Sequence, residues 1–409
     1  MAKKDTNYIS IRESRAILKN NMRQMKHYEK LKRKKLQESE YTTVMRDENN
    51  IIELDNLETC FFTDNGTVMS VNGVSFDIPK NKIIGVVGES GCGKSVTSFS
   101  IMQLVQAPQG QVTGGQIRFN SDELGFDEEG RKRAYDIAKM PTKEMYKIRG
   151  KDITMIFQEP MTSLNPVFTI GYQLDEVSFL HTKGISKEDA KKKSLEMLDK
   201  VGISIPERVY KSYPHELSGG MRQRVMIAMA LAGNPKLIIA DEPTTALDVT
   251  IQAQILELLK ELQRDQGCSI MLITHDLGVI AEMADEVVVM YAGRVIEKGT
   301  AQDIFHRPLH PYTVGLQKSK PLITSSSTEP LYSIPGQVPN PINLPDRCYF
   351  WNRCSHCGPK CMKKYPSETK VSDTHYVSCY LHEGGESKCQ SKRKSTSSKS
   401  KSTSKSKKK

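Results

Sequence analysis

Short apolar runs, separated by longer mixed segments, set the pattern of the middle of the chain. Runs of this length without polar alternation are typical of parallel strands that are buried on both faces of a sheet. We expect such central strands at residues 82–88, 237–240, 269–274 and 286–290, and two further strands at 51–54 and 71–78. Helical patterns predict helices at 96–105, 186–202 and 206–235, the last interrupted by Pro214. Strands that alternate with helices predict an α/β fold.

Outside this middle part, several segments differ in composition. Residues 8–36 predict a basic helix with apolar residues at helical spacing, which is either a solvated extension or a surface helix that contacts anionic lipid or a partner. Residues 121–148 are polar and charged, and we expect a surface loop there, with or without a partner. Recurring prolines in residues 321–346 indicate a linker or an irregular docking segment. The Lys/Ser repeats from about 384 are expected to be disordered, or to be drawn to anionic lipid headgroups.

The basic character of the chain comes from its two ends. The formal net charge is +11, of which residues 1–50 carry +6 and residues 387–409 carry +10, so that residues 51–386 hold about −5. A core that binds nucleic acid usually has a basic face. The slightly acidic core therefore argues against nucleic acid as a partner.

The apolar runs are all shorter than the roughly 18–20 residues that cross a bilayer, and the N-terminus has no apolar region of a secretory signal. We expect a cytosolic protein whose association with a membrane is peripheral. Five of the nine cysteines fall within residues 348–379. In a reducing compartment, such a cluster indicates metal ligation before disulfide formation.

A glycine-rich loop follows the apolar run at 82–88. Residues 88–95 read Gly-Glu-Ser-Gly-Cys-Gly-Lys-Ser and fit the pattern G-x-x-x-x-G-K-[ST], with a predicted strand before the loop and a predicted helix after it. The glycines allow backbone N–H groups to surround phosphate oxygens, and the helix presents its positive end to the same anion. Lys94 is expected to reach the β- and γ-phosphates of a nucleoside triphosphate, and Ser95 to bind Mg²⁺.

Two carboxylates end the apolar run at 237–240. Asp241, at the tip of the strand, suits the coordination shell of Mg²⁺, either directly or through water. Glu242 is the best candidate for polarising an attacking water molecule. Between the glycine loop and this pair lie residues 217–224, which read Leu-Ser-Gly-Gly-Met-Arg-Gln-Arg.

These three motifs, in this order, resemble those of the ATP-binding cassette (ABC) ATPases over residues 51–320. The resemblance implies a RecA-like P-loop core with an antiparallel β-subdomain and a helical signature subdomain. It implies that Gln158 contacts Mg²⁺ and water and senses a membrane subunit, that His275 holds the γ-phosphate, and that Asp248 lies in the D-loop. The nucleotide site that it predicts consists of Phe61, Gly88, Ser90, Gly91, Cys92, Gly93, Lys94, Ser95, Val96, Gln158 and Asp241, with Ser95, Gln158 and Asp241 near Mg²⁺. Ser218, Gly219 and Gly220 match the signature residues, which bind the γ-phosphate of ATP held by the opposite cassette.

The base-stacking position is one of two neighbours. The family places an aromatic residue ahead of the P-loop, and Phe61 matches this position. On a strand, Phe61 and Phe62 face opposite sides, and the alternative is that Phe61 packs within the β-subdomain. No guanine-reading motif of the Asn-Lys-x-Asp type is present, so that ATP is expected by resemblance.

Three further segments narrow the resemblance. Residues 158–166, 274–280 and 310–313 (His-Pro-Tyr-Thr) occur together, which is similar to the oligopeptide/dipeptide importer ATPases, a group that includes nickel importers. The match favours the D-type subunit, which is usually paired with a paralogous ATPase as a heterodimer. Two transmembrane permease subunits, an extracytoplasmic peptide-binding protein and a place on the cytoplasmic side of the cell membrane are implied.

The cysteine cluster matches a spacing that some members of this group use for a [4Fe–4S] cluster. The four matching residues are Cys348, Cys354, Cys361 and Cys379. Four thiolates also suit Zn²⁺, which His356 or His375 could join, and a site without metal is the third reading. A fifth cysteine, Cys357, departs from the pattern and puts the fourth ligand and the metal in doubt.

The resulting prediction is an ATP-hydrolysing subunit of an ABC importer of oligopeptides or dipeptides. We expect a basic extension at 1–50, the ABC ATPase domain at 51–309, a Cys-rich C-terminal extension at 310–385 and a disordered tail at 386–409. A nickel importer is the first alternative. A soluble ABC ATPase of translation or DNA repair is the second, although such proteins usually carry two cassettes or a long coiled-coil insertion. A nucleic-acid adaptor that acts through the basic ends is the weakest.

Overall fold

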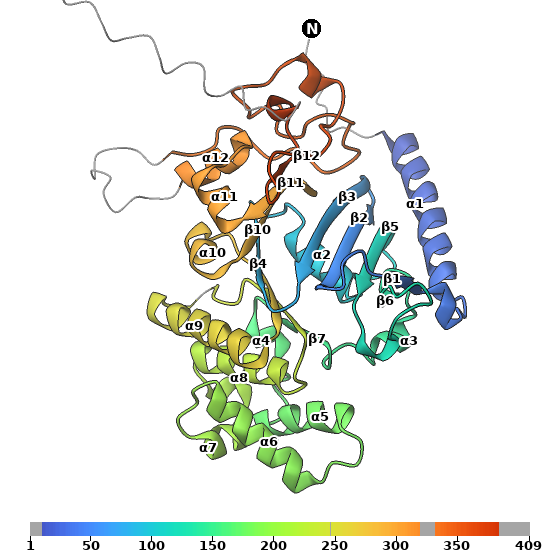
Figure 1. The fold of residues 1–409 in the computed structure, drawn as a ribbon. Coiled ribbons are helices and arrows are strands. Elements are labelled where there is room, and N and C mark those ends of the chain that lie inside the picture. Colours follow the sequence, from blue (N-terminus) through green and yellow to red (C-terminus); the bar gives the residue numbers. More distant parts are fainter. Residues whose placement is uncertain (1–9, 246, 320–331, 384–409) are drawn as a thin grey trace, which may run out of the picture.

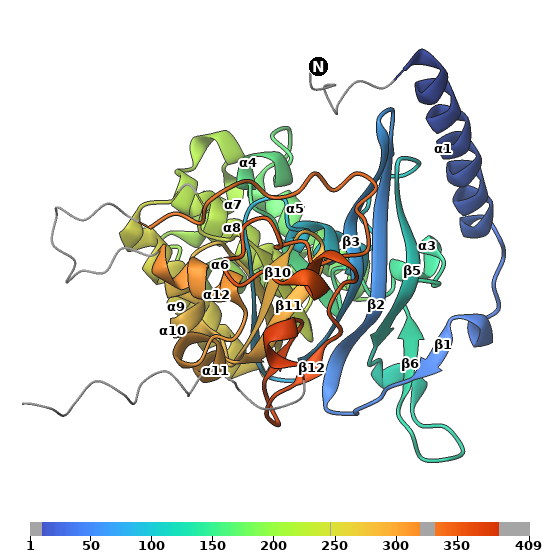
Figure 2. The ribbon, with the colours of Figure 1, turned by 90° about the horizontal axis from the view of Figure 1, so that it is seen from above.

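Two β-sheets, lying face to face, form the centre of the molecule (Figure 2). The computed structural model describes residues 10–245, 247–319 and 332–383. The larger sheet has eight strands in the order β12-β13-β11-β10-β4-β9-β8-β7, and the smaller has five in the order β1-β6-β5-β2-β3. The strands are β1 (Thr42–Val44), β2 (Asn50–Thr63), β3 (Gly66–Pro79), β4 (Ile83–Val87), β5 (Gly110–Phe119), β6 (Arg133–Asp136), β7 (Ile153–Ile156), β8 (Leu237–Asp241), β9 (Ser269–Ile273), β10 (Glu286–Tyr291), β11 (Arg294–Thr300), β12 (Thr369–Lys370) and β13 (Tyr376–Val377).

The five neighbours β10, β4, β9, β8 and β7 are parallel, and β4, β7, β8 and β9 are buried throughout. This arrangement confirms the four central strands that the apolar runs predict. The sequence prediction did not include β7, which leads into the segment with Gln158. Because the strands are parallel, the segments that follow β4, β7, β8 and β9 leave the sheet at the same edge.

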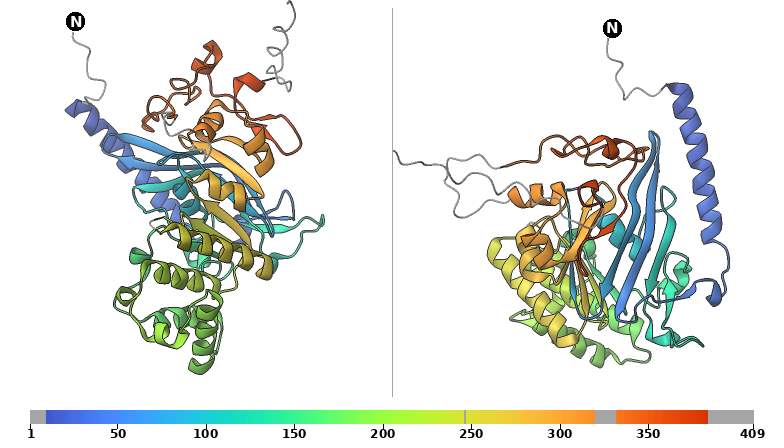
Figure 3. Two further views of the ribbon diagram at one scale, coloured as in Figure 1. Left: turned by 90° about the vertical axis from the view of Figure 1, so that its left-hand side faces the viewer. Right: turned by 45° about the horizontal axis from the view of Figure 1, so that its top comes forward.

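Alternate residues of the central strands face two different cores. Ile83, Val87, Ile238 and Leu272 join a core with the long helices, whereas Ile84, Val86 and Ile239 join a core with the smaller sheet. The order of layers is therefore helices, parallel sheet, antiparallel sheet and α1 on the outside (Figures 2 and 3). The helices are α1 (Ile11–Lys32), α2 (Lys94–Ile101), α3 (Thr142–Met145), α4 (Pro160–Ser163), α5 (Ile170–His181), α6 (Lys187–Lys200), α7 (Pro206–Lys211), α8 (Gly219–Leu231), α9 (Val249–Gln266), α10 (Leu277–Met283), α11 (Ala301–His306) and α12 (Pro311–Lys318).

Helices α5 to α8 form a group at one end of the molecule, away from the five-stranded sheet (Figure 1). Helix α6 packs against α5, α7 and α8. Leu174, Leu198, Val209 and Val225 are fully or almost fully buried in this group. The predicted break at Pro214 is present, because α7 ends at Lys211 and α8 begins at Gly219.

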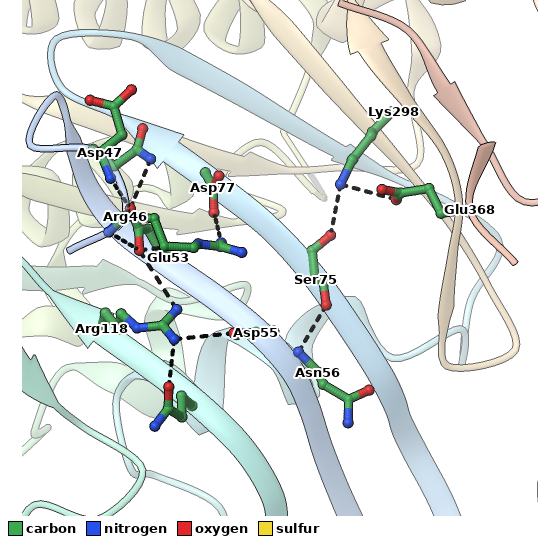
Figure 4. Close-up of polar contacts among 12 residues, drawn as sticks. Arg46, Asp47, Glu53, Asp55, Asn56, Ser75, Asp77, Arg118, Lys298 and Glu368 are labelled. Atoms are coloured by element: carbon green, nitrogen blue, oxygen red, sulfur yellow. Dashed lines mark hydrogen bonds and ion pairs between the residues drawn. The ribbon is translucent and has the colours of Figure 1, made fainter. Parts of the chain in front are cut away.

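A buried carboxylate organises the beginning of the five-stranded sheet (Figure 4). Glu53 on β2 has no exposed surface and accepts hydrogen bonds from the backbone N–H groups of Arg46 (3.0 Å) and Asp47 (2.8 Å). The guanidinium groups of Arg46 and Arg118 lie 3.3 and 3.7 Å from its Oε2. A buried charge is stable only with such compensation. The network therefore joins the segment before β2 to β5.

The C-terminal segment is joined to both sheets. Strands β13 and β12 extend the larger sheet beyond β11. Lys298 on β11 donates to the carbonyl oxygen of Ser75 on β3 at 3.4 Å and pairs with Glu368 at 3.0 Å (Figure 4). The extension thus forms part of the folded body.

The expected surface loop at 121–148 is largely a wrong prediction. Strand β6 lies inside this segment and pairs with β5 on one side and with β1 on the other. Tyr135, Ile137 and Met145 are buried. Cross-strand partners far along the chain provide this burial, which the polar composition of the segment does not indicate. Strand β1 itself lies before residue 51, where the sequence predicts the start of the cassette.

Two other predictions differ in extent. Helix α1 covers most of the predicted basic helix at 8–36, and α2 ends at Ile101, before the predicted end at 105. The prediction of a disordered tail from 384, the residue Cys389 and part of the proline-rich segment lie outside the described residues. Among the described residues, no helix has both the length and the apolar character needed to span a membrane.

Candidate ATP-hydrolysis site

The glycine loop connects β4 to α2 in a conformation that requires glycine. Gly88 and Gly93 have φ values of +156° and +101°. A Cβ atom at Gly88 would lie 2.2 Å from the carbonyl oxygen of Met290, and one at Gly93 would lie 2.3 Å from that of Ser70. At Gly91, by contrast, a Cβ atom would meet nothing within 4 Å, so that this part of the loop faces open space. The loop is therefore tightly packed on one side and free on the other.

Lys94 is buried beneath this loop. Its Nζ donates hydrogen bonds to the carbonyl oxygens of Gly88 (2.8 Å) and Glu89 (3.2 Å). Ser90 and Gly91 are exposed, Cys92 and Gly93 are buried, and Ser95 and Val96 are half-buried. The ammonium group is held at the loop by neutral carbonyl groups, so that a phosphate that replaced them would gain a charge-assisted interaction.

Asp241 lies next to the start of α2. Its Oδ1 accepts a hydrogen bond from Ser95 Oγ at 3.0 Å, which joins the end of β8 to the glycine loop. Burial raises the pKa of Asp241, and the hydrogen bond from Ser95 opposes this increase. A buried carboxylate that favours protonation is also stabilised by a bound cation. Ser95 and Asp241 therefore form a donor pair suitable for Mg²⁺.

Three segments meet at one oxygen atom of Glu242. Its Oε2 accepts hydrogen bonds from Gln158 Nε2 (3.1 Å) and Thr245 Oγ1 (2.9 Å), and it lies 3.4 Å from His275 Nδ1. Gln158 follows β7, Glu242 follows β8 and His275 follows β9, and these strands are neighbours in the sheet. The structure thus brings together the three residues that the sequence predicts to be catalytic. The His275 side chain is 66 % exposed and is open to a ligand.

The backbone at Glu242 is strained. Its φ is +47°, which non-glycine residues adopt at a cost of about 1–3 kcal/mol. The backbone N–H of Glu242 donates to the carbonyl oxygen of Ile273 on β9 at 2.8 Å, which holds this conformation. Strain of this kind is concentrated at functional sites, where the surrounding structure fixes a side chain in one direction.

The candidate base-stacking residue lies on β2. Phe62 is buried, and its ring stacks on Tyr28 of α1 with a centroid distance of 6.3 Å. Phe61 is half-buried, and its ring packs closely against Gly110. The structure therefore assigns Phe62 to the contact with α1, and base stacking by Phe61 stays a prediction.

The signature residues start α8. Ser218 is its N-cap, and its Oγ accepts a hydrogen bond from the backbone N–H of Met221 at 3.3 Å. Gly219 and Gly220 are the first two helical residues, and Ser218 and Gly219 are exposed. Within the described ranges, no hydrogen bond joins these three residues to residues 88–95. Asp248 similarly caps α9 by accepting from Ile251 N–H at 3.0 Å.

Comparison with known proteins agrees with this geometry. The model of the ABC transporter family matches residues 71–245, and that of the oligopeptide/dipeptide transporter C-terminal region matches residues 296–361. The chain is 51% identical over 331 residues to the oligopeptide transport ATP-binding protein OppD of Bacillus subtilis (strain 168), covering 81% of this chain and 88% of that protein. This chain belongs to the oligopeptide/dipeptide branch of the ABC transporter ATPases.

Other relatives and solved structures agree with this assignment. The dipeptide transport ATP-binding protein DppD of Bacillus subtilis (strain 168) is 50% identical over 333 residues, which cover 81% of this chain and 95% of that protein. The structure of the ATP-binding cassette MJ0796 bound to ADP and Pi, in a dimeric post-hydrolysis state, has a TM-score of 0.51 at 27% identity, covering 61% of this chain and 98% of that chain. The predicted family and the cassette fold are thus confirmed, and the protein is an ATPase.

In this ABC ATPase, the C-terminal extension contacts the glycine loop directly. Arg353 donates from both terminal nitrogens to the carboxylate of Glu89, at 2.8 and 3.0 Å. The backbone N–H of Glu89 donates to the hydroxyl of Tyr312 at 2.8 Å. The Arg353 side chain is only 4 % exposed, and Glu89 is 27 % exposed. The first variable position of the loop is therefore held by two residues of the extension.

These contacts were missed by sequence reasoning, as was that of Thr245. Arg353 adjoins Cys354, and the pattern of cysteines directed the interpretation of this segment towards metal binding. Tyr312 belongs to the His-Pro-Tyr-Thr segment, which served to narrow the family. The signal that could have found them is Glu89 itself, because a carboxylate at the start of a phosphate-binding loop is stabilised by a nearby cation.

The four predicted metal-ligating cysteines lie around one cavity. The cavity has a volume of about 280 Å³, and Cys348, Cys354, Cys361 and Cys379 all line it. Burial raises the pKa of Cys348 to about 12, and the neighbouring thiols contribute further to the increase. Within the described ranges, however, no group of three or more His, Cys, Asp or Glu side chains is arranged to hold a metal ion. Cys357 is exposed, and His375 instead pairs with Glu297 at 2.8 Å.

Proposed function

We propose that this chain is the ATP-hydrolysing subunit of an importer of oligopeptides or dipeptides. The observation that carries this proposal is the convergence of Gln158, Thr245 and His275 on Glu242 Oε2, beside the Lys94 loop. Curated relatives of near-full-length coverage are named as oligopeptide and dipeptide transport ATP-binding proteins. The chain would act as a peripheral subunit on the cytoplasmic side of the cell membrane.

Different residues of the site bind the phosphates, bind Mg²⁺ and activate water. The backbone of the loop and Lys94 bind the β- and γ-phosphates, while Ser95, Asp241 and Gln158 suit a Mg²⁺ ion, which neutralises phosphate charge when it is bound. Glu242 accepts a proton from the attacking water, because its carboxylate is fixed in direction by Gln158 and Thr245. His275 lies beside Glu242 and is exposed, so that it can hold the γ-phosphate.

A second cassette completes the site. Ser218 caps a 13-residue helix that begins at Gly219 and Gly220, and the exposed N-terminal end of such a helix attracts anions. We expect these residues to bind the γ-phosphate of ATP held by a paralogous ATPase subunit. The ATP bound by Lys94 would then be contacted by the partner's signature, and full activity would require the heterodimer.

An apolar surface in the segment that follows Gln158 supports docking of the permease subunits. Val167, Phe168 and Tyr172 are exposed, and the rings of Phe168 and Tyr172 stack with a centroid distance of 4.6 Å. Exposed contiguous apolar side chains are typical of protein interfaces. Because the same segment begins with Gln158, movement of a docked permease would reach Glu242 through the hydrogen bond between them.

The test is transport by the complete assembly, with the partner ATPase, both permeases and the binding protein, reconstituted in vesicles. We expect ATP-dependent uptake of a labelled oligopeptide, and uptake of nickel in its place would favour the nickel alternative. Replacement of Phe168 and Tyr172 by serine should lower uptake at least fivefold, while ATP binding by the isolated chain is unchanged. Leu180→Ser, on the exposed end of the same helix, is the matched control. Normal uptake by the double variant would contradict the docking surface.

For the cysteine-lined cavity, we retain a [4Fe–4S] cluster as the proposed occupant, with Zn²⁺ and no metal as the other outcomes. In a [4Fe–4S] cluster, each cysteine binds a different iron atom. The four thiolates therefore surround a cavity that holds the whole cluster and do not converge on a single metal ion. Their common cavity supports this proposal. The cluster would have a structural role, since every residue that lines the cavity, from His310 to Leu381, belongs to the extension.

Anaerobic purification followed by iron, sulfide and zinc analysis tests the cluster. We expect iron and sulfide with a broad visible absorption band, which Cys379→Ser should remove. Cys357→Ser is the matched control and should retain the band, because its thiol is exposed. A folded, metal-free wild-type protein would refute the proposal, and zinc without iron would replace it with a zinc site.

A further inference from the structure

Helix α1 is fixed to the five-stranded sheet by one face only. Asn21 is buried and donates from Nδ2 to the carbonyl oxygen of Thr63 at 2.8 Å. The ring of Tyr28 stacks on Phe62, and Glu29 accepts a hydrogen bond from Gln111 Nε2 at 3.1 Å. The N-terminus of the helix is closed by a capping box between Ser10 and Glu13. Helix α1 lies on the outer side of this sheet (Figures 2 and 3). The contacts set the rotation of the helix about its axis, so that its opposite face points away from the sheet.

The opposite face is a continuous basic stripe. Since successive residues of an α-helix are rotated by about 100°, seven basic residues fall within an arc of about 80° and extend over about 31 Å. All seven are exposed, and no acidic side chain of the described residues lies within ion-pair distance of any of them. The stripe consists of Arg12, Arg15, Lys19, Arg23, Lys26, Lys30 and Arg33.

An exposed apolar edge runs beside the stripe. Ile11, Leu18 and Met22 lie within an arc of about 40° that borders the basic stripe along the first half of the helix. Ile11 is 70 % and Met22 is 51 % exposed, so that these apolar side chains are not covered by the sheet. The two acidic residues of the helix, Glu13 and Glu29, are both engaged in hydrogen bonds off the stripe.

The geometry points to the outer face of α1 as a binding surface for anionic phospholipid. Basic side chains would contact the phosphate groups, and the apolar edge would enter the boundary between headgroups and acyl chains. A basic cluster next to a bilayer gains affinity with each added charge, and this attraction weakens as salt is raised. The contact would hold the ATPase subunit against the membrane independently of the permeases.

The composition of this face favours a lipid surface over single-stranded nucleic acid. Proteins that bind single strands stack bases on aromatic side chains that lie between the basic residues. The stripe contains no aromatic residue, and the one tyrosine of the helix, Tyr28, is turned inward onto Phe62. Apolar side chains without hydrogen-bonding groups beside the cations suit a headgroup boundary instead.

The experiment is flotation of the purified full-length chain with vesicles. We expect binding to vesicles of phosphatidylcholine mixed with phosphatidylglycerol, weak binding to phosphatidylcholine alone, and loss of binding at high salt. Replacement of Arg15, Lys19, Arg23 and Lys26 by glutamine should weaken binding at least 10-fold. The matched control replaces four exposed lysines of α6 by glutamine, namely Lys187, Lys192, Lys193 and Lys200, and should bind like the wild type.

The contribution of the apolar edge is tested by Leu18→Gln with Met22→Gln, which should weaken binding to the mixed vesicles several-fold without changing its salt dependence. ATP binding that equals that of the wild type shows that each variant is folded. Equal vesicle binding by the stripe variant and the wild type would overturn the proposal. So would retention of single-stranded RNA, but not of mixed vesicles, that depends on the same four residues.

Discussion

Replacement of Glu242 by glutamine is expected to lower ATP hydrolysis by the assembled transporter at least 100-fold, while ATP binding is retained. Loss of a general base typically costs a factor of about 10²–10⁴ in rate. Glutamine has the same size as glutamate and keeps an oxygen atom that can accept the hydrogen bond from Thr245, so that the geometry of the ATP site is unchanged. The glutamine side chain, however, cannot accept a proton from water. Phosphate release and ATP affinity are the two measurements.

The matched control is Glu159→Gln, the same chemical change in the residue that follows Gln158. Glu159 is exposed, and its side chain makes no hydrogen bond within the described ranges. We expect a rate of ATP hydrolysis within about twofold of that of the wild type. Surface substitutions rarely change the free energy of unfolding by more than about 0.5 kcal/mol. A Glu242→Gln protein that hydrolyses ATP at a near-normal rate would remove Glu242 from its assigned role.

Replacement of Arg353 by methionine is expected to raise the dissociation constant for ATP at least 10-fold. The guanidinium group compensates the carboxylate of Glu89, which lies within the phosphate-binding loop. Removal of one partner of a buried charge pair lowers the free energy of unfolding by about 3–5 kcal/mol. We expect a smaller loss for Arg353→Met, because Glu89 is partly exposed. The uncompensated negative charge would then repel the triphosphate, and a loss of about 1.4 kcal/mol corresponds to the tenfold effect.

A double substitution separates this electrostatic role from loss of folding. Glu89→Gln in the Arg353→Met background removes the exposed charge and should restore most of the ATP affinity, which a double-mutant cycle measures as coupling. Arg353→Lys should have an ATP affinity between those of the wild type and Arg353→Met, because lysine carries the positive charge but lacks the planar pair of donors. Arg347→Met is the matched control in the same extension, since Arg347 stacks on Trp351, 4.6 Å from the ring centroid. A double variant no better than Arg353→Met would disprove the compensation.

The extension thus contacts the glycine loop directly and also contains the candidate metal site. Tyr312, which is fully buried, holds the backbone of Glu89 from one side, and Arg353 holds its carboxylate from the other. Arg353 also donates to the carbonyl oxygens of Pro335 and Ile334, so that its position depends on the fold of the extension. Changes at the cysteine-lined cavity next to it are therefore expected to alter ATP affinity.

Local chemistry made the main parts of the protein predictable from the sequence alone. The strand, the glycines and the helix of the loop at 88–95 are contiguous in the sequence, so that one short motif identifies all three. Ser218 caps α8 by the same kind of short-range contact. Burial of uninterrupted apolar runs likewise determined the central parallel strands. The nucleotide loop and the central strands followed from these features, whereas the family and the roles of Gln158 and His275 followed from the resemblance of the motifs to those of ABC ATPases.

Tertiary structure alone decided which distant groups meet. Gln158 and Glu242 are 84 positions apart and meet because β7 and β8 are paired, whereas Glu89 and Arg353 meet across 264 positions. Strand β6 exists because β1 and β5 supply its hydrogen-bond partners, although the composition of 121–148 indicates a loop. The basic stripe on α1 points outward because Asn21 and Tyr28 fix the opposite face. Contacts of this kind depend on the packing of whole elements, which no local pattern of residues specifies.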